Sequence, residues 1–484
     1  MICLGVDLGT SGLKVALLDG DDLIATASRP LRVLRPHVGW SEQDPEDWWN
    51  ALVACLDELQ ASEPAALAAT AALGLSGQMH GATLLDARGQ VLRPCILWND
   101  GRSQAQCAEL EARWPALRTV TGNPAMAGFT APKLLWVREH EPELFERTAL
   151  VLLPKAYLRW RLTGEAIEEM SDASGTLWLD VGARRWSADA LAACGMAMNQ
   201  MPRLVEGSAP AGEVRGEWVR RWGFARPPLV AGGAGDNAAG AVAVGAVHAG
   251  DAFVSLGTSG VLWATTARFA PNPDHAVHAF CHALPDTWHQ MGVLLAAASS
   301  LTWWAQVTGH DEPALLAEAE SAPPSAPCWF APYLNGERTP HNDATVRGGF
   351  AGVDAGTTRA DMTRAVLEGV GYALRDARDS LAAAGTKLAE ADLIGGGARS
   401  ALWAQWLADI LNLPLHQVAH SELGCALGAA RLARMAAGEG LGVARKPQRL
   451  RSFEPRPAEA ERHGARHAQW RSLYPALKAL PPAR

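Results

Sequence analysis

The sequence lacks the patterns that would place the protein outside the cell or in a membrane. Its eight cysteines contain no CxxC pair and are scattered along 484 residues, unlike the dense frameworks of secreted disulfide proteins. No uncharged apolar run reaches the roughly 18 residues that a membrane helix needs, and no basic region precedes the apolar N-terminal stretch. We therefore expect a soluble, unexported protein in the reducing cytoplasm.

An excess of positive charge is also missing. Lys and Arg number 43 against 51 Asp and Glu, which gives a formal net charge of −8 and excludes a strongly basic nucleic-acid-binding protein. The arginine-rich tail from Arg445 to Arg471 contains interspersed glutamates, which predicts a solvated helix and no nucleic-acid contact. Neither nucleic acid nor a membrane is an expected partner.

Three signatures of common enzyme classes are absent as well. The chain has no GxxxxGK[ST] loop, no GxGxxG dinucleotide spacing and no GxSxG nucleophile elbow. Its 48% hydrophobic and 19% charged residues are typical of a globular chain with a large core, and its length favours two large domains or about three smaller ones. Any nucleotide must therefore bind to glycine loops of another kind.

Glycine is abundant, with 47 residues, and it gathers in short turns after apolar segments. Residues 2–8 and 13–17 alternate apolar and other side chains around the turn at 9–12, which predicts a β-hairpin. The pentapeptide LGTSG recurs at 256–260, again between apolar runs, which favours two similar halves. A third glycine turn, at 395–398, follows an apolar run and precedes a helical pattern.

Several helices have clear start and stop signals. Asp44 before Pro45 predicts an N-cap and a helix over about 45–60. Thr358 begins a sequence like a capping box, and the helical pattern that follows runs to Gly385. Residues 320–327 predict a loop. Strands that alternate with helices indicate an α/β fold.

The glycine turns have a chemical interpretation. A Gly-Thr-Ser turn can present backbone N–H groups and hydroxyls in a concavity that binds phosphate oxygens. Any one of them alone is more often an ordinary tight turn. Three such turns in two similar halves favour a bound nucleotide.

Two aspartates stand out because each lies next to a glycine turn. Asp7 ends the first predicted strand, and Asp236 lies in AGGAGDNAAG, where Gly and Ala let a substrate approach the backbone. A structural alternative is that Asp236 caps a helix that begins at Asn237. If a nucleotide binds, one aspartate should serve Mg²⁺ and the other the attacking hydroxyl.

Two further groups of residues have more than one interpretation. Gln78-Met79-His80-Gly81 follows an apolar strand at 71–75, where α/β folds recognise ligands, although a structural turn is an equal alternative. Aromatic faces suit sugar rings, but core packing is the favoured interpretation for four tryptophans. These are Trp48, Trp49, Trp303 and Trp304.

Nine segments resemble the FGGY family of carbohydrate kinases over essentially the whole chain. They are GVDLGTSGLKV (5–15), WSEQDPEDWW (40–49), GLSGQMHGATLLD (74–86), ILWNDGR (96–102), FTAPKLLWV (129–137), AGDNAAGAV (234–242), SLGTSGV (255–261), YLNGERTPH (333–341) and LIGGGARS (393–400). The resemblance implies two ribonuclease-H-like domains of the actin, hexokinase and Hsp70 ATPase type, with the active site in the cleft between them. We expect an N-terminal, sugar-binding domain at 1–245 and a C-terminal, nucleotide-binding domain with a helical tail at 246–484.

The resemblance also implies an activity. Members of the family phosphorylate sugars with ATP and Mg²⁺, and QMHGATLLD and LWNDGR favour D-xylulose, phosphorylated at its 5-hydroxyl. The alternatives within the family are ribulose, a deoxy-ketose or glycerol. A non-enzymatic sugar-sensing regulator is the alternative from another class. Whether the chain forms a homodimer is left open.

The roles of single residues are carried over from the resemblance. Asp236 matches the catalytic base, Asp7 matches an aspartate that serves Mg²⁺-ATP through water, and Met79 with His80 matches the sugar-contacting pair, to which Asn237 is added. The residues expected to bind the nucleotide are Gly9, Thr10, Ser11, Lys14, Gly257, Thr258, Ser259, Gly396, Gly397 and Ala398. Ala234 departs from the all-glycine run that the family leads us to expect before Asp236.

Overall fold

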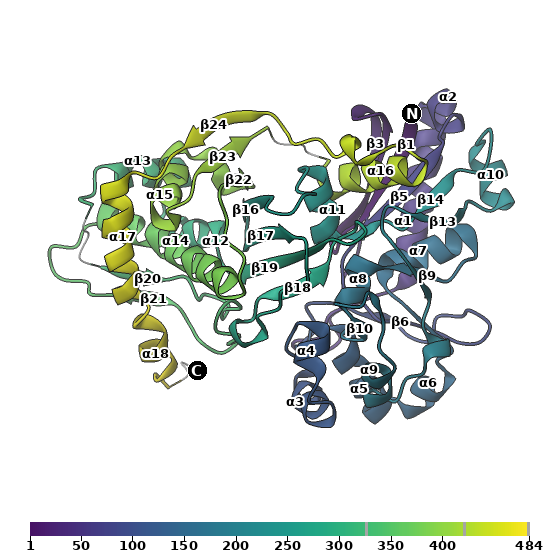
Figure 1. Ribbon diagram of the computed structural model, residues 1–484, viewed down its shortest axis with the longest axis horizontal. Coiled ribbons are helices and arrows are strands. Elements are labelled where there is room, and N and C mark those ends of the chain that lie inside the picture. The colour runs from purple at the N-terminus through teal and green to yellow at the C-terminus, as the bar shows by residue number, and fades with distance from the viewer. Residues whose placement is uncertain (325–327, 420–422, 482–484) are drawn as a thin grey trace.

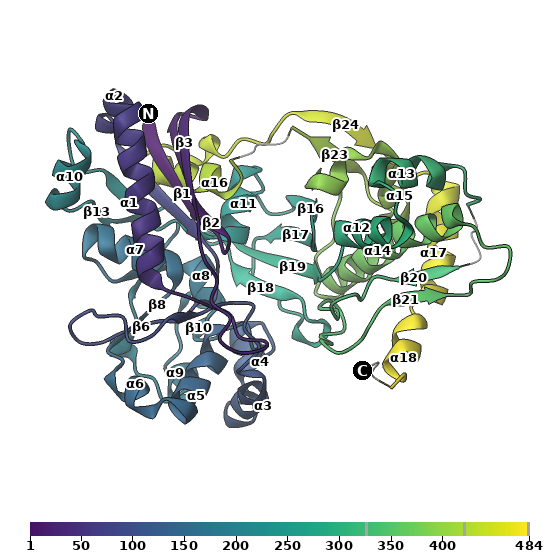
Figure 2. The ribbon, with the colours of Figure 1, turned by 180° about the vertical axis from the view of Figure 1, so that it is seen from behind.

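The computed structural model describes residues 1–324, 328–419 and 423–481. Each half of the chain builds a seven-stranded sheet, and the two sheets lie beside each other along the long axis of the molecule (Figures 1 and 2). The first sheet contains β1 (Ile2–Leu8), β2 (Gly12–Asp19), β3 (Asp22–Pro30), β5 (Ala72–Gly77), β13 (Pro210–Glu213), β14 (Leu229–Ala231) and β15 (Ala234–Gly235). The second contains β16 (Ala252–Leu256), β17 (Gly260–Thr266), β18 (His278–Cys281), β19 (Trp288–Leu294), β22 (Ala391–Ile394), β23 (Leu415–Val418) and β24 (Arg449–Phe453).

Helices and short strand pairs surround these sheets. The helices of the first half are α1 (Pro45–Ser62), α2 (Pro64–Ala68), α3 (Gln104–Arg113), α4 (Leu117–Thr121), α5 (Thr130–His140), α6 (Pro142–Arg147), α7 (Pro154–Thr163), α8 (Met170–Ser174), α9 (Ala188–Ala193), α10 (Gly216–Trp222) and α11 (Asp236–Ala243). Those that follow are α12 (Ala298–Thr308), α13 (Glu312–Glu320), α14 (Arg359–Ala383), α15 (Ala401–Leu411), α16 (Cys425–Ala436), α17 (Pro457–Trp470) and α18 (Leu473–Lys478). The short pairs are β4 (Glu42–Gln43) with β7 (Cys95–Ile96), β6 (Thr83–Leu85) with β8 (Leu150–Leu152), β9 (Ile167–Glu169) with β12 (Arg203–Val205), β10 (Leu179–Asp180) with β11 (Arg185–Trp186), and β20 (Trp329–Ala331) with β21 (Gly349–Ala351).

The two sheets repeat one topology. In the first, β1 pairs antiparallel with β2, β2 antiparallel with β3, and β1 parallel with β5, which is parallel to β14. In the second, β16, β17, β19, β22 and β23 pair with the same directions in the same order. Both predicted Gly-Thr hairpins are present, so the prediction of two similar halves is confirmed.

The helix signals in the sequence also proved accurate. Helix α1 begins at Pro45, and the Asp44 side chain accepts a hydrogen bond from the backbone N–H of Glu46 at 2.9 Å. Helix α14 begins with the predicted capping box at Thr358, and Gly385 beyond its end has a φ of +88°. The loop predicted at 320–327 begins one residue late, because Glu320 still belongs to α13, and residues 325–327 lie outside the described part of the chain.

Helix α16 lies against the first sheet although it comes from the later part of the chain (Figures 1 and 2). Its backbone approaches β5 so closely that a Cβ added at Gly74 would lie 1.9 Å from the carbonyl oxygen of Ala429. Only glycine allows such an approach. The division into domains between residues 245 and 246 stays a prediction. Helix α16 comes from the chain after residue 246 but packs on the first sheet.

The prediction of a solvated helix for the arginine-rich tail is only partly right, because residues 457–470 form a helix but one face of it is buried. Residues 449–453 form β24 at the edge of the second sheet, antiparallel to β23. Helix α17 buries four residues, Ala460, His463, His467 and Trp470, and the Trp470 indole donates a hydrogen bond to the carbonyl of Phe330 at 2.8 Å. These residues recur at helical spacing on one face. Charged residues separate them in the sequence, so the buried face is hard to recognise there. Among the described residues, no helix is long and apolar enough to cross a membrane.

Candidate active site

The structure brings the two predicted aspartates together at one end of the first sheet. In the strand register, Asp7 on β1 lies opposite Ser76 on β5, and Ala234 on β15 lies opposite Ser76 from the other side. Asp236 follows β15 directly. Burial and the negative charge of Asp7 raise the pKa of Asp236 to about 7. Burial also raises the pKa of Asp7, which Ser76 and Lys14 partly offset.

The local sequence orients the Asp236 carboxylate. Helix α11 begins at Asp236 with Gly235 as its N-cap, so the alternative of a helix that begins at Asn237 is wrong by one residue. Oδ1 of Asp236 accepts hydrogen bonds from the backbone N–H of Asn237 at 2.7 Å and from its Nδ2 at 3.0 Å. In the described part of the chain no hydrogen bond to Oδ2 is present, so this oxygen is available for a substrate.

The predicted sugar-contacting pair begins with Met79, which lies beside Gly235, the residue before Asp236. A Cβ added at Gly235 would lie 2.9 Å from the sulfur of Met79. Nδ1 of His80 lies 2.7 Å from the carbonyl oxygen of Gly175, and burial lowers the pKa of His80 to about 3. The ring is therefore neutral. A carbonyl oxygen can only accept, so Nδ1 holds the proton and Nε2 is left as an acceptor.

A hydrogen-bond network that no sequence pattern signals joins the first glycine turn to Gln78, the residue before this pair. The Thr10 hydroxyl donates to Oε1 of Gln78 at 2.9 Å and accepts from the indole N–H of Trp98 at 2.9 Å. Nε2 of Gln43 donates to the Thr10 carbonyl at 2.7 Å, and Nε2 of Gln78 donates to Oε1 of Gln43 at 2.7 Å. Gln43 and Trp98 lie within motifs quoted above, but no local pattern links either residue to Thr10.

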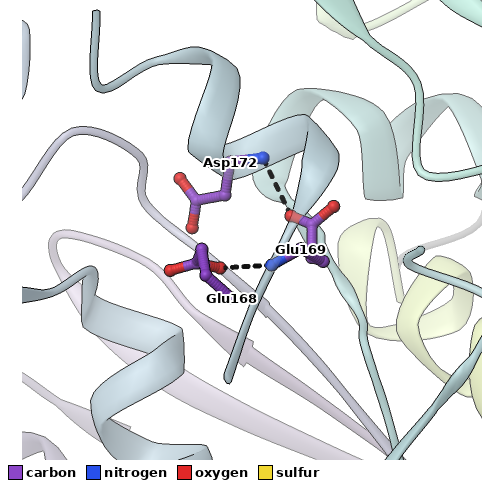
Figure 3. Close-up of side chains that lie close together, drawn as sticks. All are labelled: Glu168, Glu169 and Asp172. Carbon is purple, nitrogen blue, oxygen red and sulfur yellow. Dashed lines mark hydrogen bonds between the residues drawn. The ribbon is translucent and has the colours of Figure 1, made fainter. Parts of the chain in front are cut away.

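A buried acidic cluster contacts the residue before Asp236. Glu168, Glu169 and Asp172 lie within 4.8 Å of one another and form the one group with metal-type geometry among the described residues (Figure 3). The Lys155 ammonium occupies their centre, 2.8 Å from Asp172, 3.2 Å from Glu169 and in direct contact with Glu168. Because a protein cation already holds that place, we assign no metal there. Oε1 of Glu169 accepts a hydrogen bond from the backbone N–H of Gly235 at 3.2 Å, which anchors the residue before Asp236.

The second LGTSG turn borders a pocket in the other half of the chain. The pocket has a volume of about 320 Å³ and is lined by Thr258, Ala298, Ser299, Thr302, Trp303 and Gln306. The turn is tied to the start of α12, because the Ala298 N–H donates to the carbonyl of Gly257 at 2.8 Å and the Ser299 hydroxyl donates to that of Thr258 at 2.7 Å. Among the residues predicted to bind the nucleotide, Thr258 is the one that lines this pocket.

The packing interpretation of four tryptophans needs one correction. Trp48, Trp49 and Trp304 are buried in the core as expected. Trp303 packs on Phe330 with ring centroids 5.7 Å apart, but it also lines the pocket beside Thr258. Neighbours in a helix point about 100° apart, so adjacent tryptophans face different surroundings.

The turn at 395–398 and the turn at 257–260 lie at the same end of the second sheet. Strand β22 pairs parallel with β16, so residues 257–260 and 395–398 both follow the carboxyl ends of neighbouring strands. Gly395 has a φ of +93°, and a Cβ there would lie 2.7 Å from the carbonyl oxygen of Leu256. As the sequence predicts, a strand, this turn and the helix α15, capped by Ser400, follow one another.

Comparisons with known proteins agree with this architecture. The model of the FGGY family of carbohydrate kinases, N-terminal domain, matches residues 2–243, and that of the C-terminal domain matches residues 252–437. A xylulose kinase of Escherichia coli (strain K12) is 51% identical over 483 residues, 99% of each chain. The crystal structure of a xyloylose (xylulose) kinase from Brucella ovis superposes with a TM-score of 0.96 at 49% identity, covering 99% of this chain and 100% of that one. A gluconate kinase from Lactobacillus acidophilus superposes with a TM-score of 0.93 at 25% identity, covering 99% and 98%.

The two family models together span most of the chain, and the fold repeats across two sheets as the sequence motifs imply. The chain belongs to the FGGY family of carbohydrate kinases.

Proposed function

We propose that this chain transfers the γ-phosphoryl group of ATP to the 5-hydroxyl of D-xylulose. The observation that carries the proposal is that Asp236, whose pKa burial raises to about 7, directly follows Gly235, which packs against Met79. The near-full-length similarity to a xylulose kinase at 51% identity supports the choice of sugar.

Asp236 is the proposed general base. A sugar hydroxyl has a pKa far above that of a carboxyl group, so Asp236 need not ionise it in advance. In a loose phosphoryl-transfer transition state the hydroxyl proton leaves late, and a carboxylate already in place accepts it. The contacts of Oδ1 with Asn237 leave Oδ2 to take that proton. A pKa near 7 makes this carboxylate a stronger base than an ordinary aspartate.

Met79 and His80 are the proposed sugar-contacting residues. Because Nδ1 of His80 donates to the Gly175 carbonyl, Nε2 can accept a hydrogen bond from a sugar hydroxyl. Met79 would pack its thioether against the apolar edge of the sugar, between His80 and Gly235. The sugar would then lie next to Asp236, because Met79 already touches the loop that carries it.

Asp7 fits a role beside a magnesium ion, held directly or through water. Mg²⁺ takes oxygen ligands and often shares one or two carboxylates with substrate phosphates. Burial raises the pKa of both Asp7 and Asp236, and the negative charge of Asp7 adds to the shift of Asp236, so a cation bound here would favour their charged forms. When bound, Mg²⁺ would offset charge on the β- and γ-phosphates.

ATP is proposed to bind on the second sheet and to reach the first glycine turn with its phosphates. The pocket beside Thr258 has polar and aromatic walls of the kind that hold a nucleoside. The proposed phosphate contacts are Lys14 and the turns at 9–11, 257–259 and 396–398. Since the Thr10 hydroxyl is already bound to Gln78 and Trp98, we assign its role to positioning the turn.

A substrate panel tests the proposed function. ADP release from Mg²⁺-ATP should be fastest with D-xylulose, with a kcat/KM at least about tenfold above that for D-ribulose, glycerol or D-gluconate. The measurement is a coupled ADP assay with each acceptor and a control without sugar. Another preferred acceptor would replace D-xylulose in the proposal, and no sugar-dependent ADP release at all would favour the sugar-sensing alternative.

The pKa of Asp236 predicts a pH profile. A protonated carboxyl group cannot accept the hydroxyl proton, so kcat/KM for D-xylulose should fall below about pH 7 and level off above it. The fall should approach about tenfold per pH unit. Initial rates at low sugar concentration, with the coupling enzymes in proven excess at each pH, measure this. A flat profile from about pH 5.5 to about pH 8 would remove Asp236 from the role of a titrating base.

A further inference from the structure

We infer that Lys133 and Thr130 are positioning residues that clamp the His80 peptide and so direct the histidine ring at the sugar. This inference rests on the proposed role of His80 in sugar binding. It assigns a task to the FTAPKLLWV segment at 129–137, which the proposed mechanism does not use.

The His80 backbone needs support. Its φ of +69° lies in the left-handed region, which non-glycine residues rarely adopt and which persists where surrounding structure enforces it. The residue that follows is closely packed, because a Cβ at Gly81 would lie 2.6 Å from the ring of Pro154 and 2.9 Å from the sulfur of Cys95. The left-handed peptide is therefore enclosed by tight packing.

Two donors from the start of α5 converge on the carbonyl oxygen of this peptide. Nζ of Lys133 donates to it at 2.9 Å, and Oγ1 of Thr130 donates to it at 3.1 Å. A carbonyl oxygen has two lone pairs, so these two contacts use its full accepting capacity. The peptide carbonyl is thereby held in one direction.

Within the described residues, the Lys133 side chain donates to the His80 carbonyl and to no other acceptor. Its side chain is 0% exposed, and within the described residues it has no ion-pair partner, since nearby Asp100 pairs with Arg102. Burial lowers its pKa to about 7. A buried amine without a carboxylate partner is costly. The hydrogen bond to the His80 carbonyl is what the amine provides and an apolar side chain of the same length would lack.

The His80 ring is held by separate contacts with Gly175 and Phe129. Nδ1 of His80 lies 2.7 Å from the carbonyl oxygen of Gly175, and a Cβ at Gly175 would lie 2.5 Å from the ring. Phe129, next to Thr130, meets the ring edge to face with centroids 4.6 Å apart. Backbone and ring are thus both fixed, and Nε2 keeps one direction and one protonation state.

Kinetics of four single variants test the clamp. Lys133→Met keeps the length of the side chain and removes the donor, and we expect the KM for D-xylulose to rise about tenfold or more while the KM for ATP stays within about twofold. Thr130→Val should raise the sugar KM by about threefold, whereas Thr130→Ser, which retains the hydroxyl, should stay within about twofold of wild type.

Leu134→Ala is the matched control. Leu134 is as buried as Lys133 on the same helix, so its truncation lowers stability without touching the His80 carbonyl. We expect both KM values of this variant to stay within about twofold of wild type. A sugar KM that stays unchanged in Lys133→Met, or that rises equally in Leu134→Ala, would overturn the inference.

A crystal structure of the Lys133→Met/Thr130→Val variant gives a readout that does not depend on activity. We expect His80 to leave the left-handed region or to lose its contact with Gly175. Retention of both in that variant would contradict the clamp. If the wild type phosphorylates no sugar, the proposed function fails, and this comparison still decides whether the two donors hold the peptide.

Discussion

Asp236→Asn is expected to lower kcat by about 10³-fold or more, while the affinity for ATP stays within about twofold of wild type. Asparagine matches aspartate in size, and its amide oxygen can still accept from the backbone N–H of Asn237, but it cannot take a proton from the sugar hydroxyl. Steady-state ADP release at saturating substrates measures kcat, and calorimetric titration with a non-hydrolysable ATP analogue measures affinity. A kcat close to that of the wild type would exclude Asp236 as the base.

The same variant should be more stable than the wild type at alkaline pH. The folded chain holds the Asp236 proton up to about pH 7, whereas the unfolded chain releases it near 3.8. The folded state therefore binds more protons between these values, and the carboxyl group costs stability as the pH rises. We expect Asp236→Asn to raise Tm at about pH 8 and to lose most of that gain at about pH 5. An equal gain at both values would contradict the raised pKa.

Lys155→Met is expected to reduce the free energy of unfolding by about 3–5 kcal/mol, the largest loss of stability that we predict for a single substitution. Lys155 is the ammonium that pairs with Glu168, Glu169 and Asp172, and all four side chains are 0–1% exposed. Without it three carboxylates remain together in the interior, where burial already raises the pKa of Asp172 well above its ordinary value. Urea denaturation followed by circular dichroism, with Tm from scanning calorimetry, measures the loss.

The exposed Lys387 offers a matched control for this substitution. Lys387→Met removes the same charge at the surface and should change stability by less than about 0.5 kcal/mol. A loss of under about 1 kcal/mol in Lys155→Met would show that the cluster accommodates its carboxylates as neutral acids. A large loss would confirm that Lys155 is the cation that compensates the three buried carboxylates.

The predictions from sequence succeeded where a signal lies within a few residues. The repeated LGTSG turn, the proline after Asp44 and the capping box at Thr358 each report on their own strand or helix. Asp7 and Asp236 could be singled out as candidates because each carboxylate lies next to a glycine turn, and their roles stay predictions. The prediction for the arginine-rich tail fell short because the buried residues of α17, among them His463, His467 and Trp470, are separated by charged residues in the sequence. Only the packing of α17 shows which face is covered.

By itself the sequence predicted the two Gly-Thr hairpins and the starts of α1 and α14, and it singled out the two aspartates as candidates, since each depends on residue types and spacings along a short stretch. Only the tertiary structure decided which groups hold these residues in place. The bonds that tie Thr10 to Gln43 and Trp98 join positions 33 and 88 residues apart, and the one from Lys133 to His80 spans 53. Hydrogen bonds and charge pairs depend on separation in space, to a few tenths of an ångström. That separation exists only after the sheets and α5 have packed.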